Sequence, residues 1–382
     1  MSLVDDLLKQ PPYRTPPAQR NDLFRAALRE SLAHHCAQCP PFARWYLKQG
    51  VDPAAEIEDP VNLPFLPVSI FKRLNLQSIE QDKVVRLLKS SATSSQTPSR
   101  VVLDAITRDR QTRSLAALMG ALIGPLRRPF LVLDAPPAAG TALELSARVA
   151  GMRGYLMMAS EAHYVLESRH GELVLDVEKL RGLLGDFSAK GLPVCLLGYT
   201  YVLYRHVVVP LLQQGLRLEL PPQSFVLHFG GWKRLEQHAV DRGRLNYDVE
   251  QVFAMDRPMD RPWIHDIYGF TEHLGIIYPD NGQGVRLAPA YAEVFTRDPM
   301  TLEALPDGVP GLLQFVSPLP HSYPGVSVLL DDMGRIVSRN REEDGRCGTR
   351  FEVLGRARGA EIRGCGDTLP DQIYAPPGVG RA

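Results

Sequence analysis

Four segments of the chain carry side chains whose types and spacing could do chemistry. The first, residues 90–99, is a run of hydroxyl-bearing side chains that follows a short apolar stretch. A loop of this kind after a strand can hold phosphate oxygens with backbone N–H and side-chain O–H donors. It lacks the GxxxxGKS/T pattern of the large NTPase class, and taken alone it favours a flexible Ser/Thr linker. The candidate phosphate donors are Ser90, Ser91, Thr93, Ser94 and Thr97.

Two further segments combine groups that suit other parts of a nucleotide. In Tyr268-Gly269-Phe270-Thr271-Glu272, an aromatic ring can stack on a purine, a hydroxyl can hold a phosphate, and a carboxylate can bind Mg²⁺. In residues 331–336, Asp332 precedes Met333-Gly334 and could accept both hydroxyls of a ribose from a strand end before a tight turn. The structural alternatives are a turn with a solvated Glu272 and an ordinary β-hairpin with a polar turn.

The fourth segment is a basic, glycine-rich stretch around a single thiol. Cys365 lies there among Arg356, Arg358 and Arg363. Nearby positive charge lowers a thiol pKa and so raises the thiolate fraction. The pattern therefore favours a nucleophilic Cys365 over an incidental surface residue. A different thiol pair, Cys36 and Cys39, follows two histidines, but no second pair stands at zinc-finger spacing, so a helix end with buried thiols is expected.

The apolar pattern from residue 129 onward predicts the fold that positions these segments. Short apolar runs alternate with helical stretches, which is typical of an α/β fold with mostly parallel sheets flanked by helices. Ligands bind such sheets beyond the carboxyl ends of the strands, where Gly198, Gly230 and Gly231 lie. The expected strands are residues 130–134, 154–158, 194–198 and 224–231, and the expected helices are residues 141–151, 176–189 and 199–214.

The flanking regions differ from this α/β part. Helices are expected over residues 18–50 and 106–123, with a strand over residues 84–88. After about residue 260 the pattern changes to short strands and turns, which predicts a smaller β-rich subdomain, with Asp307-Gly308 and Met333-Gly334 as turn signals.

Composition restricts the class of protein. The chain has 382 residues, 45% hydrophobic and 23% charged, with 43 basic and 43 acidic residues. A formal net charge of zero gives no global field toward nucleic acid or anionic lipid. The N-terminus does not resemble a signal peptide, and no apolar run reaches the length of a membrane span. Five scattered cysteines suggest reduced thiols, so a cytoplasmic protein is expected.

The order and spacing of the four segments resemble the adenylate-forming superfamily of acyl-CoA synthetases, phenylacetate–CoA ligases and luciferases. Residues 90–99 stand at its phosphate loop, Tyr268–Glu272 at its aromatic-Gly-x-Thr-Glu motif, and Asp332 at its ribose-binding carboxylate. Residues 354–373 resemble the hinge segment of phenylacetate–CoA ligases.

The acyl-protein synthetases of bacterial bioluminescence are a closer match, over most of the chain. Their Gly-Gly-Trp-Lys segment is similar to residues 230–233, their Pro-Asp-Gly turn to residues 306–308, and their Ser-Tyr-Pro motif to residues 322–324. Cys365 stands where that family carries its acylated cysteine. The resemblance implies one adenylate-forming core domain over residues 1–354, followed by a hinge remnant and tail over residues 355–382.

The resemblance also implies an activity. ATP and Mg²⁺ would convert a carboxylic acid, expected to be a long-chain fatty acid, into an acyl-adenylate, and Cys365 would then take the acyl group for transfer to a reductase partner. Thr271 would hold the α-phosphate region, Glu272 the Mg²⁺ and Asp332 the ribose. Tyr268 and Gly231 would flank the adenine, Gly230 and Gly269 would be further cofactor-binding positions, and Arg356 would contact ribose or phosphate.

Two departures keep alternatives open. Ala92 and Ser95 replace loop glycines that permit close backbone approach to phosphate, which favours a non-catalytic, adenylate-binding descendant. The chain also stops shortly after the hinge, as the acyl-protein synthetases do, whereas CoA-forming relatives continue into a mobile domain. An enzyme that transfers the acyl group to CoA or a carrier protein is the second alternative.

Overall fold

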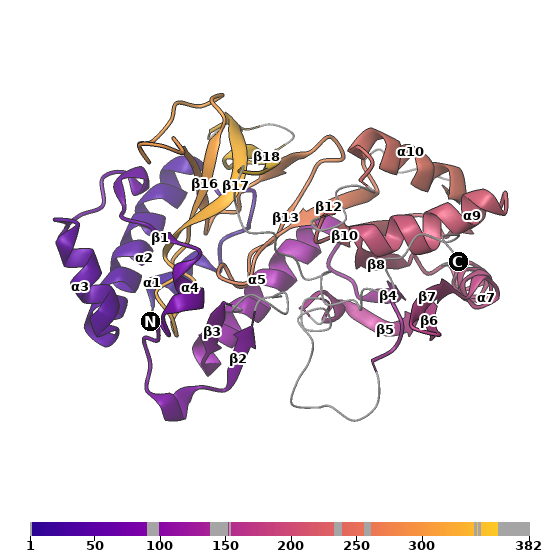
Figure 1. Cartoon of the computed structure of the whole chain (residues 1–382), viewed down its shortest axis with the longest axis horizontal. Coiled ribbons are helices and arrows are strands. Elements are labelled where there is room, and N and C mark those ends of the chain that lie inside the picture. Colours follow the sequence, from indigo (N-terminus) through magenta and orange to yellow (C-terminus); the bar gives the residue numbers. More distant parts are fainter. Residues whose placement is uncertain are drawn as a thin grey trace, which may run out of the picture. The chain divides into compact units, whose positions relative to one another are not determined.

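The computed structural model describes residues 2–89, 99–137, 152, 154–232, 239–255, 261–339, 342 and 345–357. The chain forms two compact units (Figure 1). Unit 1 contains the described residues of Met1–Ser90, Ser95–Pro125 and Tyr268–Glu361. Unit 2 contains those of Leu126–Ile267. The expected boundary after residue 354 falls within a strand, Arg350–Arg356, and stays a prediction.

Unit 2 is built on a parallel sheet with the strand order β12-β10-β8-β4-β5. Side chains along β4, β8 and β10 are buried throughout, as expected for central parallel strands covered on both faces. Figure 1 shows α7, α9 and α10 beside these strands. The sheet strands are β4 Arg128–Leu133, β5 Ala159–Tyr164, β8 Cys195–Tyr199, β10 Phe225–Phe229 and β12 Ile264–Tyr268.

Aspartates begin two of the helices of unit 2. Asp176 accepts the Lys179 backbone N–H at 3.0 Å and Asp241 accepts that of Arg244 at 2.9 Å, which satisfies N–H groups that a helix start leaves unpaired. The helices are α7 Val177–Ala189, α8 Thr200–Val202, the π-helix η3 Leu203–Val208, α9 Val209–Gln213 and α10 Arg242–Val252. The remaining strands form an antiparallel pair, β6 Leu166–Arg169 with β7 Glu172–Leu175, and a parallel pair, β9 Leu218–Leu220 with β11 Phe253–Met255.

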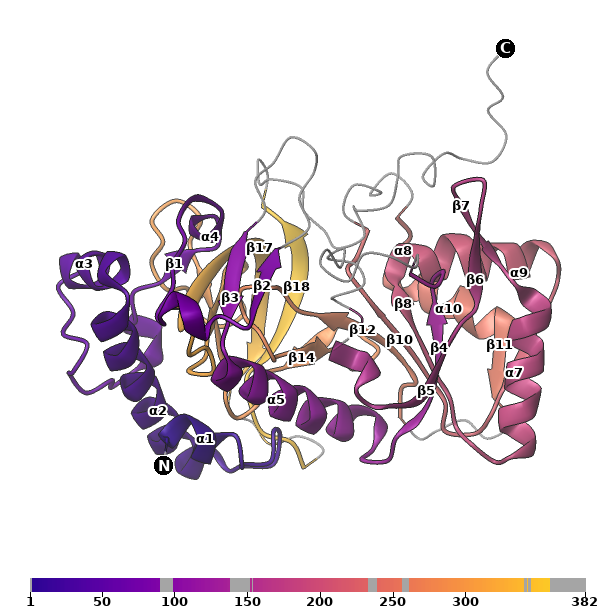
Figure 2. The ribbon, with the colours of Figure 1, turned by 90° about the horizontal axis from the view of Figure 1, so that it is seen from below.

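Unit 1 contains an antiparallel sheet with the order β14-β18-β17-β16-β15, to which β1 adds in parallel beside β17. Its strands are β1 Leu66–Pro67, β14 Val285–Leu287, β15 Glu293–Arg297, β16 Gly311–Val316, β17 Ser327–Ser338 and β18 Arg350–Arg356, and a short strand, β13, covers Tyr278–Pro279. A separate antiparallel pair joins β2 Arg86–Lys89 to β3 Arg100–Leu103, and α5 follows β3 (Figure 2). The helices are α1 Leu3–Leu7, α2 Pro17–Gln38, α3 Pro40–Lys48, η1 Pro60–Asn62, α4 Ile70–Arg73, η2 Gln81–Lys83 and α5 Ala105–Ile123.

The structure confirms the mixed α/β fold and most of the expected elements. The runs at residues 130–134, 194–198 and 224–231 are β4, β8 and β10, the helix expected at residues 176–189 is α7, and that at residues 106–123 is α5. The part after residue 260 is rich in strands, as expected. The helix expected at residues 141–151 lies outside the described residues. No helix in the described part of the chain is long and apolar enough to cross a membrane.

Residues 18–50 are helical as expected. They form two helices, because α2 ends at Gln38 and α3 begins at Pro40, so the helix end expected at the Cys36 and Cys39 segment is confirmed. A proline disfavours helical conformation in the residue before it, and Cys39 has φ −121° and ψ 89°. Residues 154–158 are not a strand: residues 154–156 are helical, and the strand begins at Ala159. A short apolar run cannot be assigned by periodicity alone.

The turn expected at Met333-Gly334 is also absent, since β17 runs unbroken from Ser327 to Ser338. A Cβ on Gly334 would lie 2.5 Å from the carbonyl oxygen of Glu352. Glycine is therefore needed there for close approach to a neighbouring strand, and the β17–β18 register shifts between Met333 and Gly334. By contrast, the turn expected at Asp307-Gly308 is confirmed, with Gly308 at φ +87°.

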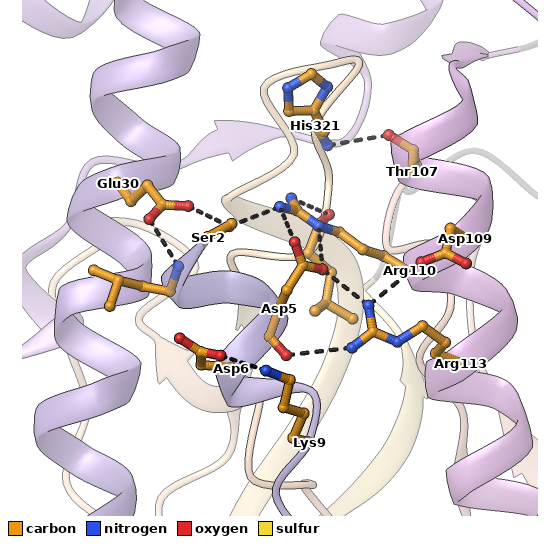
Figure 3. Close-up of polar contacts among 12 residues, drawn as sticks. Ser2, Asp5, Asp6, Lys9, Glu30, Thr107, Asp109, Arg110, Arg113 and His321 are labelled. Carbon is orange, nitrogen blue, oxygen red and sulfur yellow. Dashed lines mark hydrogen bonds and ion pairs between the residues drawn. The ribbon is translucent and has the colours of Figure 1, made fainter.

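An ionic cluster fixes the N-terminal helix of unit 1 to α5 (Figure 3). The Asp5 carboxylate accepts Arg113 Nη1 at 3.0 Å and Arg110 Nε at 3.3 Å, and the Arg110 side chain is only 6% exposed. Arg110 also donates to Ser2 Oγ, and Glu30 accepts the Leu3 backbone N–H at 2.8 Å. Burial alone would raise the pKa of Asp5, but the hydrogen bonds and charges of the two arginines lower it below 3.8.

Removing the Asp5 charge is expected to destabilise the protein. Asp5→Asn should lower the free energy of unfolding by about 1–2 kcal/mol at pH 7, because a nearly buried arginine loses a charged hydrogen-bond partner. A carboxylate whose pKa is lowered by folding contributes stability above its unfolded pKa, and this is lost as pH falls through the folded pKa. The difference between wild type and variant, measured by urea unfolding, should therefore shrink below about pH 4.

Asp6→Asn is the matched control. Asp6 also lies in the first turn of α1, but among the described residues its carboxylate pairs with Lys9 alone, in an exposed i,i+3 contact at 2.7 Å. Such surface pairs contribute less than about 0.5 kcal/mol. Equal losses in the two variants would contradict a specific role for the cluster.

Candidate active site

Tyr268, Asp332 and Arg356, three of the residues selected from the sequence, come together in unit 1. Tyr268 ends β12, and its hydroxyl donates to Asp332 Oδ2 at 2.6 Å. Asp332 in β17 and Arg356 in β18 are register partners, which places Arg356 Nε 3.6 Å from Asp332 Oδ1. Strand pairing therefore brings the carboxylate and the guanidinium together, and a side-chain hydrogen bond adds the phenol of Tyr268 from β12, a strand of the other sheet.

The Tyr268 ring lies within an aromatic cluster. It stacks on Phe315 with ring centroids 5.9 Å apart, and the Arg286 guanidinium lies 5.6 Å from its centroid. Burial, with the Asp332 charge adding to it, raises the pKa of Tyr268 well above 10. The hydroxyl therefore keeps its proton at neutral pH and acts as a donor to the carboxylate.

Glu272 and Thr271 follow on the loop after β12. Glu272 is only 4% exposed. Its backbone carbonyl oxygen accepts a hydrogen bond from the Tyr323 hydroxyl at 3.3 Å. The same hydroxyl accepts the Leu274 backbone N–H at 3.4 Å. The Ser322-Tyr323-Pro324 motif thus holds the backbone around Glu272. Thr271 is half-buried beside it.

Gly269 and His273 flank these two residues in the loop. A Cβ on Gly269 would meet only an ordinary contact, 3.5 Å from the Ile276 carbonyl. The ring of His273 is buried, stacks on Phe270 and lies with Nε2 2.8 Å from the Tyr278 hydroxyl. Burial lowers the pKa of His273 to about 3, so the imidazole is neutral at physiological pH.

Sequence reasoning missed a second polar contact, between Asp104 and His321. Asp104 Oδ1 begins α5 by accepting the Thr107 backbone N–H at 2.7 Å, and Oδ2 accepts His321 Nδ1 at 2.7 Å. Burial alone would raise the pKa of Asp104, but hydrogen bonds from His321 and Thr107 lower it to about 2. The contact ties β3 and α5 to the segment that holds Glu272. The Asp-x-x-Thr spacing indicates a helix cap, but nothing in the sequence links it to a histidine 217 residues away.

The expected phosphate loop joins two paired strands. Lys89 of β2 pairs with Arg100 of β3, so residues 90–99 connect the strands of an antiparallel hairpin. Several residues selected from the sequence lie outside the described residues. They are Ser90, Ser91, Thr93, Ser94, Thr97 and Cys365.

Gly230 and Gly231 lie at the carboxyl end of β10 in unit 2, as expected. Phe229 pairs with Ile267 in the neighbouring parallel strand β12, so both strands end at the same edge of the sheet. The two glycines have φ of +89° and +62°. A Cβ on Gly230 would lie 2.8 Å from Tyr199 Cδ1, whereas one on Gly231 would meet nothing within 4 Å.

Among the described residues, no group of three or more His, Cys, Asp or Glu side chains could hold a metal ion. The carboxylate of Glu272 remains a hard oxygen donor of the kind that Mg²⁺ prefers. Mg²⁺ is usually held by one or two carboxylates together with the phosphates of a substrate. The residues of the site fit an ion that is held mainly by a nucleotide.

Solved structures of a CoA ligase share the fold of this chain. Over 92% of this chain and 78% of the other, the open conformation of 2-hydroxyisobutyryl-CoA ligase in complex with 2-HIB-AMP and CoA gives a TM-score of 0.63 at 13% identity. The same ligase in its thioesterification state gives 0.64 at 13% identity, over 90% of this chain and 69% of the other.

The chain belongs to the family described as "Acyl-protein synthetase, LuxE", whose model matches residues 1–374. It is therefore a ligase. Two relatives named long-chain-fatty-acid–luciferin-component ligase, from Vibrio harveyi and Aliivibrio fischeri, are 24% and 23% identical to it. Both alignments cover 97% of this chain and 94% of the relative.

The two glycines after β10 are expected to differ in their tolerance of a side chain. Gly231→Ala should cost about 1 kcal/mol of unfolding free energy, because only the positive φ is strained. Gly230→Ala should cost about 2–4 kcal/mol, because its methyl group also presses on the buried Tyr199 ring. Urea unfolding of both variants tests this, and equal losses would show that the contact with Tyr199 is unimportant.

Proposed function

We propose that the protein activates a carboxylic acid with ATP and then carries the acyl group as a thioester on Cys365. The observation that carries the adenylation step is the joining of Tyr268, Asp332 and Arg356, next to the loop that bears Thr271 and Glu272. Family membership supports the acyl-protein step, and the names of the two relatives favour a long-chain fatty acid as substrate.

In the first step a carboxylate oxygen of the acid attacks the α-phosphorus of ATP. The bond from that phosphorus to the bridging oxygen breaks, and pyrophosphate leaves. Such transfers depend on positioning and on neutralisation of charge. Asp332 accepts the ribose hydroxyls, Arg356 contacts ribose or phosphate, and Thr271 holds the α-phosphate region. Tyr268 and Gly269 contact the adenine, and the hydroxyls of residues 90–97 bind the β- and γ-phosphates. Gly230 and Gly231 of unit 2 stay proposed nucleotide-binding positions.

Glu272 is the proposed protein ligand of Mg²⁺. The ion would neutralise charge on the phosphate oxygens and on departing pyrophosphate. Because Tyr323 fixes the backbone at Glu272, the carboxylate starts from a defined position. No further metal ligand is assigned.

In the second step the sulfur of Cys365 attacks the acyl carbon of the adenylate. The carbon–oxygen bond to AMP breaks, AMP leaves, and the thiol proton passes to solvent. Burial works against this role at three other thiols, since it raises the pKa of Cys36 to about 11 and also raises the pKa of Cys39 and Cys195. A thiolate is the nucleophile, so these thiols are poor candidates.

The remaining assignments follow from this cycle. A thioester on the enzyme needs an acceptor, and a reductase is the proposed partner. We propose that residues 355–382 are a hinge remnant and tail, and that this segment brings Cys365 to the adenylate. The proposed location is the cytoplasm, where thiols stay reduced.

Wild type and Cys365→Ser should separate the two steps. Each is incubated with ATP, Mg²⁺ and a panel of fatty and aryl acids, and pyrophosphate release and intact-protein mass are followed. Wild type is expected to release pyrophosphate and to gain an acyl mass that hydroxylamine removes. Cys365→Ser should release pyrophosphate without forming that thioester.

Cys347→Ser is the matched control, because Cys347 is a half-exposed free thiol in β-rich unit 1. This variant should form the thioester as wild type does. Pyrophosphate release without a thioester in any variant would make CoA or a carrier protein the acceptor. No pyrophosphate release with any acid would favour the non-catalytic descendant, with Ala92 and Ser95 as the altered loop positions.

A further inference from the structure

We propose that the Tyr268 hydroxyl is a positioning group that makes the enzyme select ribonucleotides, by holding the Asp332 carboxylate in one orientation. The inference rests on the proposed function, because it assumes that Asp332 meets the sugar of ATP. It assigns to the phenol oxygen a task separate from any contact between the Tyr268 ring and a base.

The packing around the Tyr268 ring fixes the position of its hydroxyl beside Asp332. Its ring stacks on Phe315 at 5.9 Å and 30°, and Phe270 and Tyr278 are further neighbours at 6.3 and 6.5 Å. The Arg286 guanidinium, itself buried, lies 5.6 Å from the ring and donates to the Tyr278 carbonyl at 2.7 Å. A ring packed in this way has one position for its hydroxyl, so the 2.6 Å bond to Asp332 Oδ2 has a fixed direction.

The carboxylate is held at its other oxygen as well. Arg356 Nε lies 3.6 Å from Oδ1, which is an ionic contact beyond hydrogen-bond length. The Asp332 side chain is 23% exposed, so a ligand can still reach it. An ionised carboxylate has about four acceptor positions. Tyr268 occupies one of them, and the free positions keep a fixed orientation toward an incoming sugar.

A fixed pair of acceptors suits a vicinal diol. Both ribose hydroxyls can donate to a carboxylate that does not rotate, whereas a deoxyribose leaves one acceptor without a donor. Sites built to hydrogen-bond a hydroxyl reject analogues that lack it, because a desolvated polar group stays unpaired. Without the phenol oxygen, the carboxylate can turn toward water and satisfy that acceptor, so the penalty against deoxyribose falls.

The test compares Tyr268→Phe with wild type on ATP, 2′-deoxy-ATP and 3′-deoxy-ATP. The variant keeps the ring and removes only the oxygen. Acid-dependent pyrophosphate release gives kcat/KM for each nucleotide, and equilibrium dialysis with AMP, 2′-deoxy-AMP and 3′-deoxy-AMP gives a readout without turnover. The ratio of ribo- to deoxynucleotide is expected to fall about tenfold in both assays, the size of one hydrogen bond to a charged group.

Tyr278→Phe is the matched control. It removes a buried hydroxyl from the same aromatic cluster, one that contacts His273 and not Asp332. Loosening of the cluster in general would lower the ratio in both variants, which would overturn the inference. An unchanged ratio in Tyr278→Phe with a reduced one in Tyr268→Phe supports it.

Asp332→Ala separates this inference from the proposed function. If it abolishes the preference for ribose while Tyr268→Phe keeps it, Asp332 binds the sugar and the positioning role of Tyr268 is wrong. If wild type itself binds AMP and the deoxy analogues equally, the ribose role of Asp332 fails, and the inference fails with it. Loss of pyrophosphate release alone, with ribose preference in binding intact, would count against the catalytic proposal only.

Discussion

The register between β17 and β18 is the constraint on which the candidate site depends. It sets Asp332 opposite Arg356, and side chains alternate faces along a strand, so a slip of one residue would turn every side chain of β18 to the other face. Gly334 protects this register: its missing Cβ lets the neighbouring strands approach to a distance that any side chain would prevent. Sheet packing and the proposed contact with the ribose therefore rest on the same two strands.

The loop that bears Glu272 is held from a different direction. Tyr323 fixes its backbone, and the residues just before Tyr323 are bonded to α5 and β3 through Thr107 and Asp104. The same contacts therefore link β3, the strand that follows the expected phosphate loop in the sequence, to the segment that holds Glu272. The lowered pKa of Asp104 keeps that carboxylate charged over the physiological pH range.

The sequence predicted the elements whose pattern is local. The apolar runs of β4, β8 and β10 are buried throughout, and α7 buries Leu180, Leu184 and Phe187 at helical spacing, so burial and periodicity agree. The prediction was wrong where the same residue or run suits two different structures. Gly334 was interpreted as a turn but serves close packing, and the run at residues 154–158 suits helix and strand equally.

The candidate site also combines residues that a local motif predicts with contacts that no local pattern predicts. Tyr268, Asp332 and Glu272 were found because their residue types match a motif, whereas the Tyr268–Asp332 bond and the Asp104–His321 pair join residues 64 and 217 positions apart. Such pairings follow from tertiary packing, which single-residue chemistry does not encode.

The arrangement separates recognition from reaction. Asp332 and Arg356, which are proposed to contact the sugar, lie on paired strands of a sheet, where backbone hydrogen bonds fix their positions. The proposed phosphate donors and Cys365 belong in sequence to the connection between β2 and β3 and to the chain after β18. Binding and catalytic groups are often carried on connections that a rigid scaffold positions. In the proposed two-step cycle, this division would let the sugar contacts stay fixed while the adenylate forms and while Cys365 takes the acyl group. The Tyr268–Asp332 bond would then keep the same geometry in both steps.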